Sequence, residues 1–158
     1  MSDGRFALAP LAEDPGSALK ELVRRSLGEL ERAILATPDG VLVAASNPSE
    51  LDDLLAALSA AVVAGVRDAF RRYLLIGVKD VTVELEDGRV VMMRDLGSAV
   101  LCLVTRPKPN FGLIYHLLSK YVNRLLAALE QKYLAQTVEP TPLDGGSVQA
   151  APKAAYKL

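Results

Sequence analysis

The sequence is poor in the residues that build covalent or metal-held sites. Its 158 residues include one Cys and one His. A single Cys excludes an internal disulfide and a thiolate zinc site, and a single His excludes a multi-histidine metal site. A Ser/His/Asp triad would have to use that one histidine, His116. Tryptophan is absent and aromatic residues make up only 5%, so the 51% hydrophobic content is carried by aliphatic side chains and predicts an aliphatic core.

The chain also lacks an excess of either charge and a long hydrophobic run. Lys and Arg number 18 and Asp and Glu number 19, giving a formal net charge of -1, so no overall positive field is available to bind nucleic acid. The longest apolar run, residues 54–66, is well short of the ~20 residues that span a membrane. Residues 1–14 lack the basic-then-apolar order of a secretory signal. We expect a cytoplasmic, soluble protein with no nucleic acid partner and no membrane insertion.

The length predicts one folded domain between two flexible ends. Residues 1–16 contain two prolines and two glycines without sustained periodicity. Residues 135–158 contain three prolines and a Gly-Gly pair, with few large apolar side chains to offset the entropy of ordering. We predict a flexible leader over residues 1–16, a domain over residues 17–134 and a flexible tail over residues 135–158.

Periodicity and turn residues predict three helices and five strands. Residues 38–40 read Pro-Asp-Gly, which suits a hairpin turn, and residues 99–104 are apolar at every position, as in a central strand. The predicted elements are, in order, a helix that Ser17 caps and Gly28 ends, strands over residues 30–37 and 41–46, a helix from Leu51 to Tyr73, strands over residues 74–87, 89–95 and 99–104, and a helix from Ile114 to Tyr133.

The second predicted helix has apolar residues on two sides. Ser49 and Asp52 have the spacing of a capping box at its start. Large residues recur with a 3.6-residue period, and we predict that they lie on the sheet: Leu51, Leu54, Leu55, Leu58, Val62, Val66, Ala69, Phe70 and Tyr73. Small residues form another side: Ala56, Ala57, Ala60, Val63 and Ala64. These small residues either supply helix propensity alone or pack closely against a partner helix, and we favour the partner helix.

No set of residues indicates catalysis. His116 shares its side of the last predicted helix with polar residues, so we expect it to face water. Cys102 lies within an apolar strand, where burial disfavours the thiolate. No phosphate-binding loop follows a predicted strand, and no pair of carboxylates forms a convincing acid/base site. We therefore assign no catalytic, cofactor-binding or metal-binding residue and predict that the protein is not an enzyme.

Four segments form a recognisable combination: the hairpin of residues 33–46, the small-residue helix, the strands that end with residues 99–104, and the helix start at residues 110–113. Together, over about residues 17–134, they resemble the roadblock family of dynein light chains and prokaryotic GTPase regulators. The resemblance implies an α+β fold in the order α-β-β-α-β-β-β-α. Its five-stranded antiparallel sheet would run second, first, fifth, fourth, third strand, with helices on both faces.

The resemblance also implies a partner. In that family two copies join their third strands edge to edge and lay their middle helices side by side, and small Ras-like GTPases dock over the paired helices. Carried onto this sequence, the dimer interface would comprise Ala56, Ala60, Val63, Ala64, Arg67, Val81, Thr82, Val83, Glu84 and Leu85. We expect a non-enzymatic homodimeric adaptor that binds and regulates a small Ras-like GTPase, with no catalytic residue to transfer.

Two other interpretations belong to different classes of protein. A small-molecule sensor of profilin-like or PAS-like layout would need an internal cavity in place of a densely filled aliphatic core. An enzyme of another type would need a nucleophile, a base and an oxyanion-binding group, which this sequence does not assemble. The scarcity of polar residues on apolar faces favours the dimeric adaptor over both.

Overall fold

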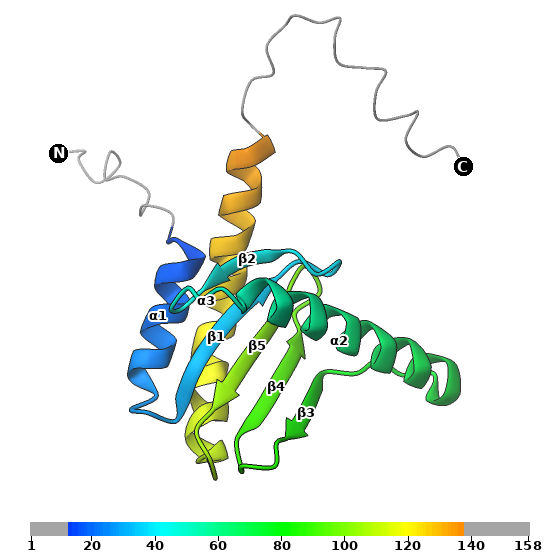
Figure 1. The fold of residues 1–158 in the computed structure, drawn as a ribbon. Coiled ribbons are helices and arrows are strands. Elements are labelled where there is room, and N and C mark those ends of the chain that lie inside the picture. Colours follow the sequence, from blue (N-terminus) through cyan, green and yellow to red (C-terminus); the bar gives the residue numbers. More distant parts are fainter. Residues whose placement is uncertain (1–12, 138–158) are drawn as a thin grey trace, which may run out of the picture.

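Three helices enclose a five-stranded antiparallel sheet (Figure 1). The computed structural model describes residues 13–137. Their elements are α1 (Pro15–Arg25), β1 (Leu30–Ala36), β2 (Leu42–Ala45), α2 (Asp52–Leu74), β3 (Asp80–Glu84), β4 (Val90–Asp95), β5 (Val100–Thr105) and α3 (Phe111–Thr137). The strands run in the order β2-β1-β5-β4-β3, with α2 on one face and α1 and α3 on the other. The predicted fold class, element order and central position of β5 are confirmed.

The sheet separates two hydrophobic cores. The larger core lies under α1 and α3 and includes Leu22, Leu35, Leu101, Leu103 and Leu125, all at most 1% exposed. The smaller core lies under α2 and includes Ile34, Met93, Val100 and Cys102. Both faces of β5 are therefore covered, which is why its sequence is apolar at successive positions.

The first helix begins two residues earlier than predicted. Pro15 occupies its first turn, where the missing N–H costs no intrahelical bond. The side chain of Asp14 accepts a hydrogen bond from the backbone N–H of Ser17 at 3.1 Å, so Asp14 caps the helix in place of Ser17. Residues 15–16 and 135–137 of the predicted flexible ends thus belong to α1 and α3. Residues 1–12 and 138–158 of those ends lie outside the described residues.

The third strand is shorter than predicted because the second helix continues further. Leu74 is still helical, and Leu75, with φ +59°, ends α2 in the left-handed region. Leu85 lies beyond β3, in the turn to β4, where its N–H donates to the carbonyl of Arg89 at 2.8 Å. The predicted hairpin turn is present, with Gly40 at φ +96° between β1 and β2.

The two edges of the sheet differ. Strand β2 is four residues long, its pairing with β1 shifts register after Leu35, and Nζ of Lys132 on α3 donates to the carbonyl of Val43 at 3.3 Å. Strand β3 pairs only with β4 within the described residues. Among the helices of residues 13–137, none combines the length and the apolar run that crossing a bilayer requires.

Candidate partner interface

A buried carboxylate fixes the start of α2. Asp52 is 2% exposed. One of its oxygens accepts from Nη1 of Arg32 on β1 at 2.9 Å, and the other accepts from the backbone N–H of Ser49 at 2.8 Å. Asp52 thus accepts from Ser49 as one half of the predicted capping box requires, but the Ser49 hydroxyl does not cap the helix, whose N-cap is Leu51. This ion pair ties the first turn of α2 to the sheet.

The small-residue side of α2 faces the protein's own sheet, so the predicted orientation of this helix is wrong. Ala56, Ala60 and Val63 are 0%, 4% and 1% exposed. Of the residues predicted to lie on the sheet, Leu55 and Val62 pack partly against the smaller core, whereas Leu54 and Leu58 point outward and are 67% and 55% exposed. Ala56, Ala60 and Val63 are thus covered by the chain's own sheet and cannot form an exposed contact with a partner helix.

The reason for these small residues is a close approach within the chain. A Cβ added at Gly40, in the β1–β2 turn, would lie 3.2 Å from Cα of Ala57 and 3.7 Å from Cβ of Ala60. Larger side chains on this side of α2 would push the helix off the hairpin. Because this contact joins the β1–β2 turn to α2, the local sequence of α2 alone does not indicate it.

The second helix is longer than the sheet beneath it. Five strands about 4.8 Å apart span about 20 Å, whereas 23 helical residues at 1.5 Å each span about 35 Å. Burial accordingly stops at Val63. Figure 1 shows the C-terminal half of α2 projecting past the sheet on the side of β3. Helix length against sheet width could have predicted this projection from the sequence.

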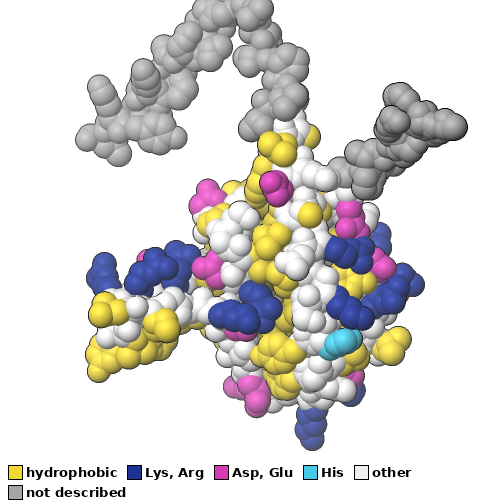
Figure 2. Space-filling view, turned by 180° about the vertical axis from the view of Figure 1, so that it is seen from behind, with side chains coloured by type: hydrophobic (Ala, Val, Ile, Leu, Met, Phe, Trp, Pro, Cys, Tyr) yellow, Lys and Arg dark blue, Asp and Glu magenta, His cyan; other side chains and the backbone are white. Residues whose placement is uncertain are grey.

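The projecting half continues the sheet-facing side of α2 without a sheet. Helical spacing from Val63 leads to Arg67, Phe70 and Leu74 on the same side. Phe70 is 45% and Leu74 55% exposed, and Leu75 beyond the helix is 85% exposed. Figure 2 shows hydrophobic side chains on one side of this projection and Lys and Arg side chains on the other. An apolar side of this kind is typical of an interaction surface.

Of the predicted interface residues, Ala64 and Arg67 lie where α2 leaves the sheet. Ala64 is half-buried. Nη1 of Arg67 donates to a carboxylate oxygen of Asp95, at the end of β4, at 3.2 Å. This bond raises the pKa of Arg67 above its ordinary value. Arg67 thus links the projecting half of α2 to the sheet.

The predicted strand residues lie on the free edge. Thr82, Val83 and Glu84 are exposed, and Val81 packs partly against the core under α2. The carbonyl of Lys79 and the N–H of Leu85 bond toward β4. In an antiparallel ladder the inward-bonding residues alternate, so the N–H and C=O groups of Asp80, Thr82 and Glu84 point away from β4. This row of main-chain groups is a template for another strand.

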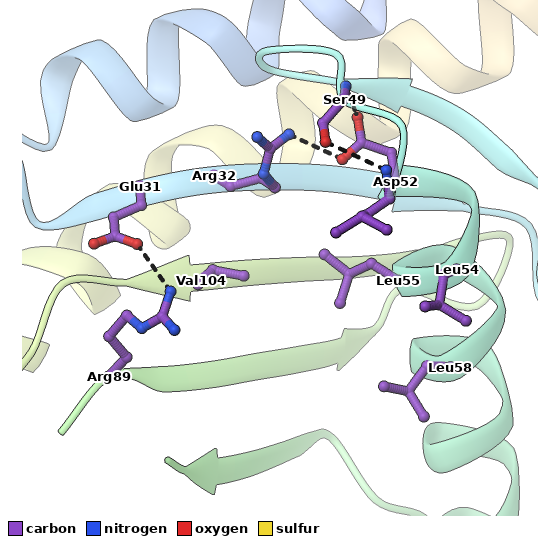
Figure 3. Close-up of a pocket in the computed structure, with 10 residues that line it drawn as sticks. Glu31, Arg32, Ser49, Asp52, Leu54, Leu55, Leu58, Arg89 and Val104 are labelled. Atoms are coloured by element: carbon purple, nitrogen blue, oxygen red, sulfur yellow. Dashed lines mark hydrogen bonds and ion pairs between the residues drawn. The ribbon is translucent and has the colours of Figure 1, made fainter. Parts of the chain in front are cut away.

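A surface hollow of about 480 Å³ adjoins the outer side of α2 (Figure 3). Leu54, Leu55 and Leu58 form its helical wall, and Val104 of β5 lies on the sheet beside them. Charged groups complete the rim: the ion pair of Arg32 with Asp52, and Glu31, which lies 3.5 Å from Nη1 of Arg89. An apolar centre within a charged rim is the usual anatomy of a protein interface.

The remaining sequence candidates are placed as predicted. His116 is exposed on α3. Cys102 is buried, and burial raises the pKa of its thiol to about 11. In residues 13–137, no cluster of three or more His, Cys, Asp or Glu side chains is arranged to hold a metal ion.

An antiparallel sheet covered by helices on both faces, with β3 at one edge and α2 longer than the sheet is wide, defines the fold class of the described residues. The chain belongs to the Roadblock/LC7 domain family, whose sequence model matches residues 19–105. It is similar to the uncharacterized protein MJ0714 of Methanocaldococcus jannaschii, with 25% identity over 116 residues that cover 69% of this chain and 98% of that protein.

Two solved structures have the same fold. One is the Roadblock/LC7 domain from Streptomyces avermitilis, with a TM-score of 0.65 and 20% identity over 78% of this chain and 99% of that one. The other is an MglB with a tetrameric arrangement, with a TM-score of 0.61 and 20% identity over 78% of this chain and 98% of that one.

Proposed function

We propose that this protein is a homodimeric, non-enzymatic regulator that binds a small Ras-like GTPase. The observation that carries the proposal is the sheet-facing side of α2, which continues through Phe70 and Leu74 after the sheet has ended. Membership of the Roadblock/LC7 family, which is generally one of adaptors and regulators, supports the regulatory role. The tetrameric arrangement of the similar MglB supports self-association.

A second copy supplies a sheet against which the projecting half of α2 can pack. Joining two β3 edges extends the sheet on the side toward which α2 projects. Phe70 and Leu74 of each copy then cover the sheet of the other copy, beside its α2. The hollow along Leu55 and Leu58 receives this helix end. The contact removes apolar surface from water in both copies and closes both open edges.

Charge favours one register for the joined strands. A twofold pairing about Thr82 sets Asp80 opposite Glu84 of the partner subunit, and like charges directly opposite each other are destabilising. Pairing about Val83 sets Val83 opposite the partner's Val83 and Thr82 opposite the partner's Glu84. The main-chain groups that bond across the join still belong to residues whose N–H and C=O point outward. Pairing about Val81 avoids this contact too, but Val83 is the more exposed of the two valines and gains more from being covered, so we propose that the twofold axis lies at Val83.

Disulfide formation tests this register. Residues directly opposite in a non-hydrogen-bonded pair have Cα atoms about 4.5 Å apart, within the range of a disulfide. Val83→Cys should give a covalent dimer under mild oxidation, and Thr82→Cys, the matched control, should give much less. The buried Cys102 leaves the background low. Preferential cross-linking through Thr82→Cys would contradict the register.

Mass in solution tests the dimer itself. Light scattering at micromolar concentration should give twice 16.9 kDa. Phe70→Glu places a charge on the side of α2 that needs a second sheet, so this variant should be monomeric. Arg72→Glu changes charge on the opposite side of the same helix turn and should remain dimeric. A dimer that survives Phe70→Glu and gives no cross-link through Val83→Cys would exclude this interface.

The GTPase part of the proposal has a separate test. Ras-like GTPases from the same genome, loaded with GDP or a non-hydrolysable GTP analogue, should co-elute with the protein in one of the two states. Ala61→Glu places a charge at an exposed position of α2 that does not line the hollow, so it should weaken GTPase binding and leave the mass unchanged. Rates of hydrolysis and of nucleotide exchange then define the regulatory effect. Absence of co-elution in both states would refute GTPase binding and leave the dimer standing.

A further inference from the structure

A long groove follows α3 on the face of the sheet opposite α2. It consists of two hollows, of about 620 and 400 Å³, that meet at Leu126. One wall is α3 itself, and the other includes Lys79, Arg94 and Ser98. From Tyr115 to Leu134 the α3 wall is about 28 Å long, at 1.5 Å per residue. This groove does not overlap the interface proposed above.

The two walls of the groove differ in polarity. Along α3, Tyr115 is 44% exposed and Leu126 is half-buried. Figure 2 shows this side of the molecule, where hydrophobic side chains form a broken line down the face. Across the groove, Arg94 donates two hydrogen bonds to Asp80, at 2.6 and 2.9 Å. An occupant therefore needs one apolar side for α3 and a polar side for water and the opposite wall.

The sequence after α3 contains such a segment. Within residues 147–158 every even position is apolar, and most odd positions are Ser, Gln or Lys. A period of two gives an extended chain one apolar side. The even positions are Val148, Ala150, Pro152, Ala154, Tyr156 and Leu158. Proline in their midst disfavours a helix and is compatible with a single extended strand that has no ladder partner at that position.

The connection to this segment has the required length and turn residues. Helix α3 ends at Thr137, next to the Leu134 end of the groove. Residues 138–146 include two prolines, which stop the helix, and a Gly-Gly pair, which permits a reversal. At about 3.3 Å per residue, the eight steps from Val148 to Tyr156 span about 26 Å, close to the length of the groove.

We propose that residues 147–158 fold back and bind the groove along α3 of the same chain. Val148 then lies at the Leu134 end and Tyr156 at the Tyr115 end. The apolar even positions cover the α3 wall, and the two lysines among the odd positions stay in water. The bound segment covers the half-exposed side of α3, so any partner of this face has to displace it.

Paramagnetic labelling of the full chain tests the site and its direction. A nitroxide on Gln149→Cys should cause loss of amide signals near Leu134, and one on Lys157→Cys should cause loss near Tyr115. Cys102 is buried and its thiolate is disfavoured, so the label attaches at the introduced cysteine. Uniform weak loss with both labels, or the reverse order, would overturn the proposal.

A mixing experiment identifies the occupant. Chains that carry the nitroxide but no ¹⁵N are mixed with ¹⁵N-labelled chains that carry no nitroxide. No signal loss should then appear along α3. Signal loss in that mixture would assign the segment to a second copy and refute binding within one chain.

Matched variants test the apolar contact. Leu126→Glu and, separately, Tyr156→Ser should abolish the local signal loss, whereas Leu27→Glu, at a site that does not line the groove, should retain it. Tyr156 lies outside residues 13–137, so its variant keeps the test valid if Leu126→Glu fails to fold. Unchanged signal loss in Tyr156→Ser would overturn the proposal.

Discussion

The ion pair between Arg32 and Asp52 should dominate the stability of the α2 attachment. Asp52→Ala leaves the guanidinium of Arg32, whose side chain is 24% exposed, without its carboxylate partner. Breaking a fully buried pair costs about 3–5 kcal/mol. The partial exposure of Arg32 and its second hydrogen bond, to the carbonyl of Asn47, reduce this cost. The lost bond from the N–H of Ser49 adds about 1 kcal/mol, so we expect a total of about 3 kcal/mol.

Asp53→Ala is the matched control. Asp53 is exposed in the same first turn of α2, so both substitutions lose about 0.3–1 kcal/mol of interaction with the helix dipole. Only Asp52→Ala loses the ion pair and the Ser49 bond, and the resulting difference of about 3 kcal/mol corresponds to about 1.5 M urea in the unfolding midpoint, at a slope of about 2 kcal/mol per M.

Urea unfolding followed by circular dichroism measures this difference. All variants have to be compared at one protein concentration, since the proposed self-association would make stability depend on that concentration. Arg32→Leu combined with Asp52→Ala should recover part of the loss, because neither charge is then left alone. Equal midpoints for Asp52→Ala and Asp53→Ala would refute the assignment of the ion pair as the anchor of α2.

Three other substitutions test the packing around α2. Gly40→Ala should lower the free energy of unfolding by about 2 kcal/mol or more, because φ is +96° and the added Cβ meets α2. The control Gly97→Ala has a similar φ of +87° but no atom within 4 Å of the added Cβ, so it should cost about 1 kcal/mol. Ala60→Leu should cost about 1–3 kcal/mol by overpacking the smaller core, and Ala61→Leu, one exposed position further on, should be nearly neutral in thermal unfolding. Burial raises the pKa of Cys102 from 9.0 to about 11, so folding favours the protonated thiol. The stability that this preference contributes is complete below pH 9 and is lost as pH rises toward about 11. Over that range, Cys102→Ala should therefore lose less stability than the parent protein.

The element order was predictable because its signals are local. Turn residues such as Gly40 and Gly88 mark the ends of strands, and both have positive φ in the structure. The uninterrupted apolar run of β5 indicated a strand covered on both faces. The start of α1 was misplaced by two residues because Asp14 and Ser17 are both capable caps and only the folded geometry chooses between them.

The orientation of α2 was not predictable from periodicity, because two of its sides are apolar. Hydrophobicity alone ranks the leucine side as the buried one, yet Leu54 and Leu58 point outward and Ala56 is fully buried. The orientation of α2 is decided by the short distance between the helix and the β1–β2 hairpin at Gly40. This is a tertiary constraint with no local signature. The edge position of β3 agrees with the resemblance, and its role as a contact with a second copy stays a prediction.

The inequality of the two sheet edges limits how copies of this domain can accumulate. On the β2 side, the ammonium of Lys132 donates a hydrogen bond to the carbonyl of Val43, and the short strand with its shifted register presents few main-chain groups to which another strand could pair. Growth by strand addition is therefore one-sided. If two molecules pair through β3 as proposed, no third can join by the same route, and the product would be a closed pair instead of a fibre.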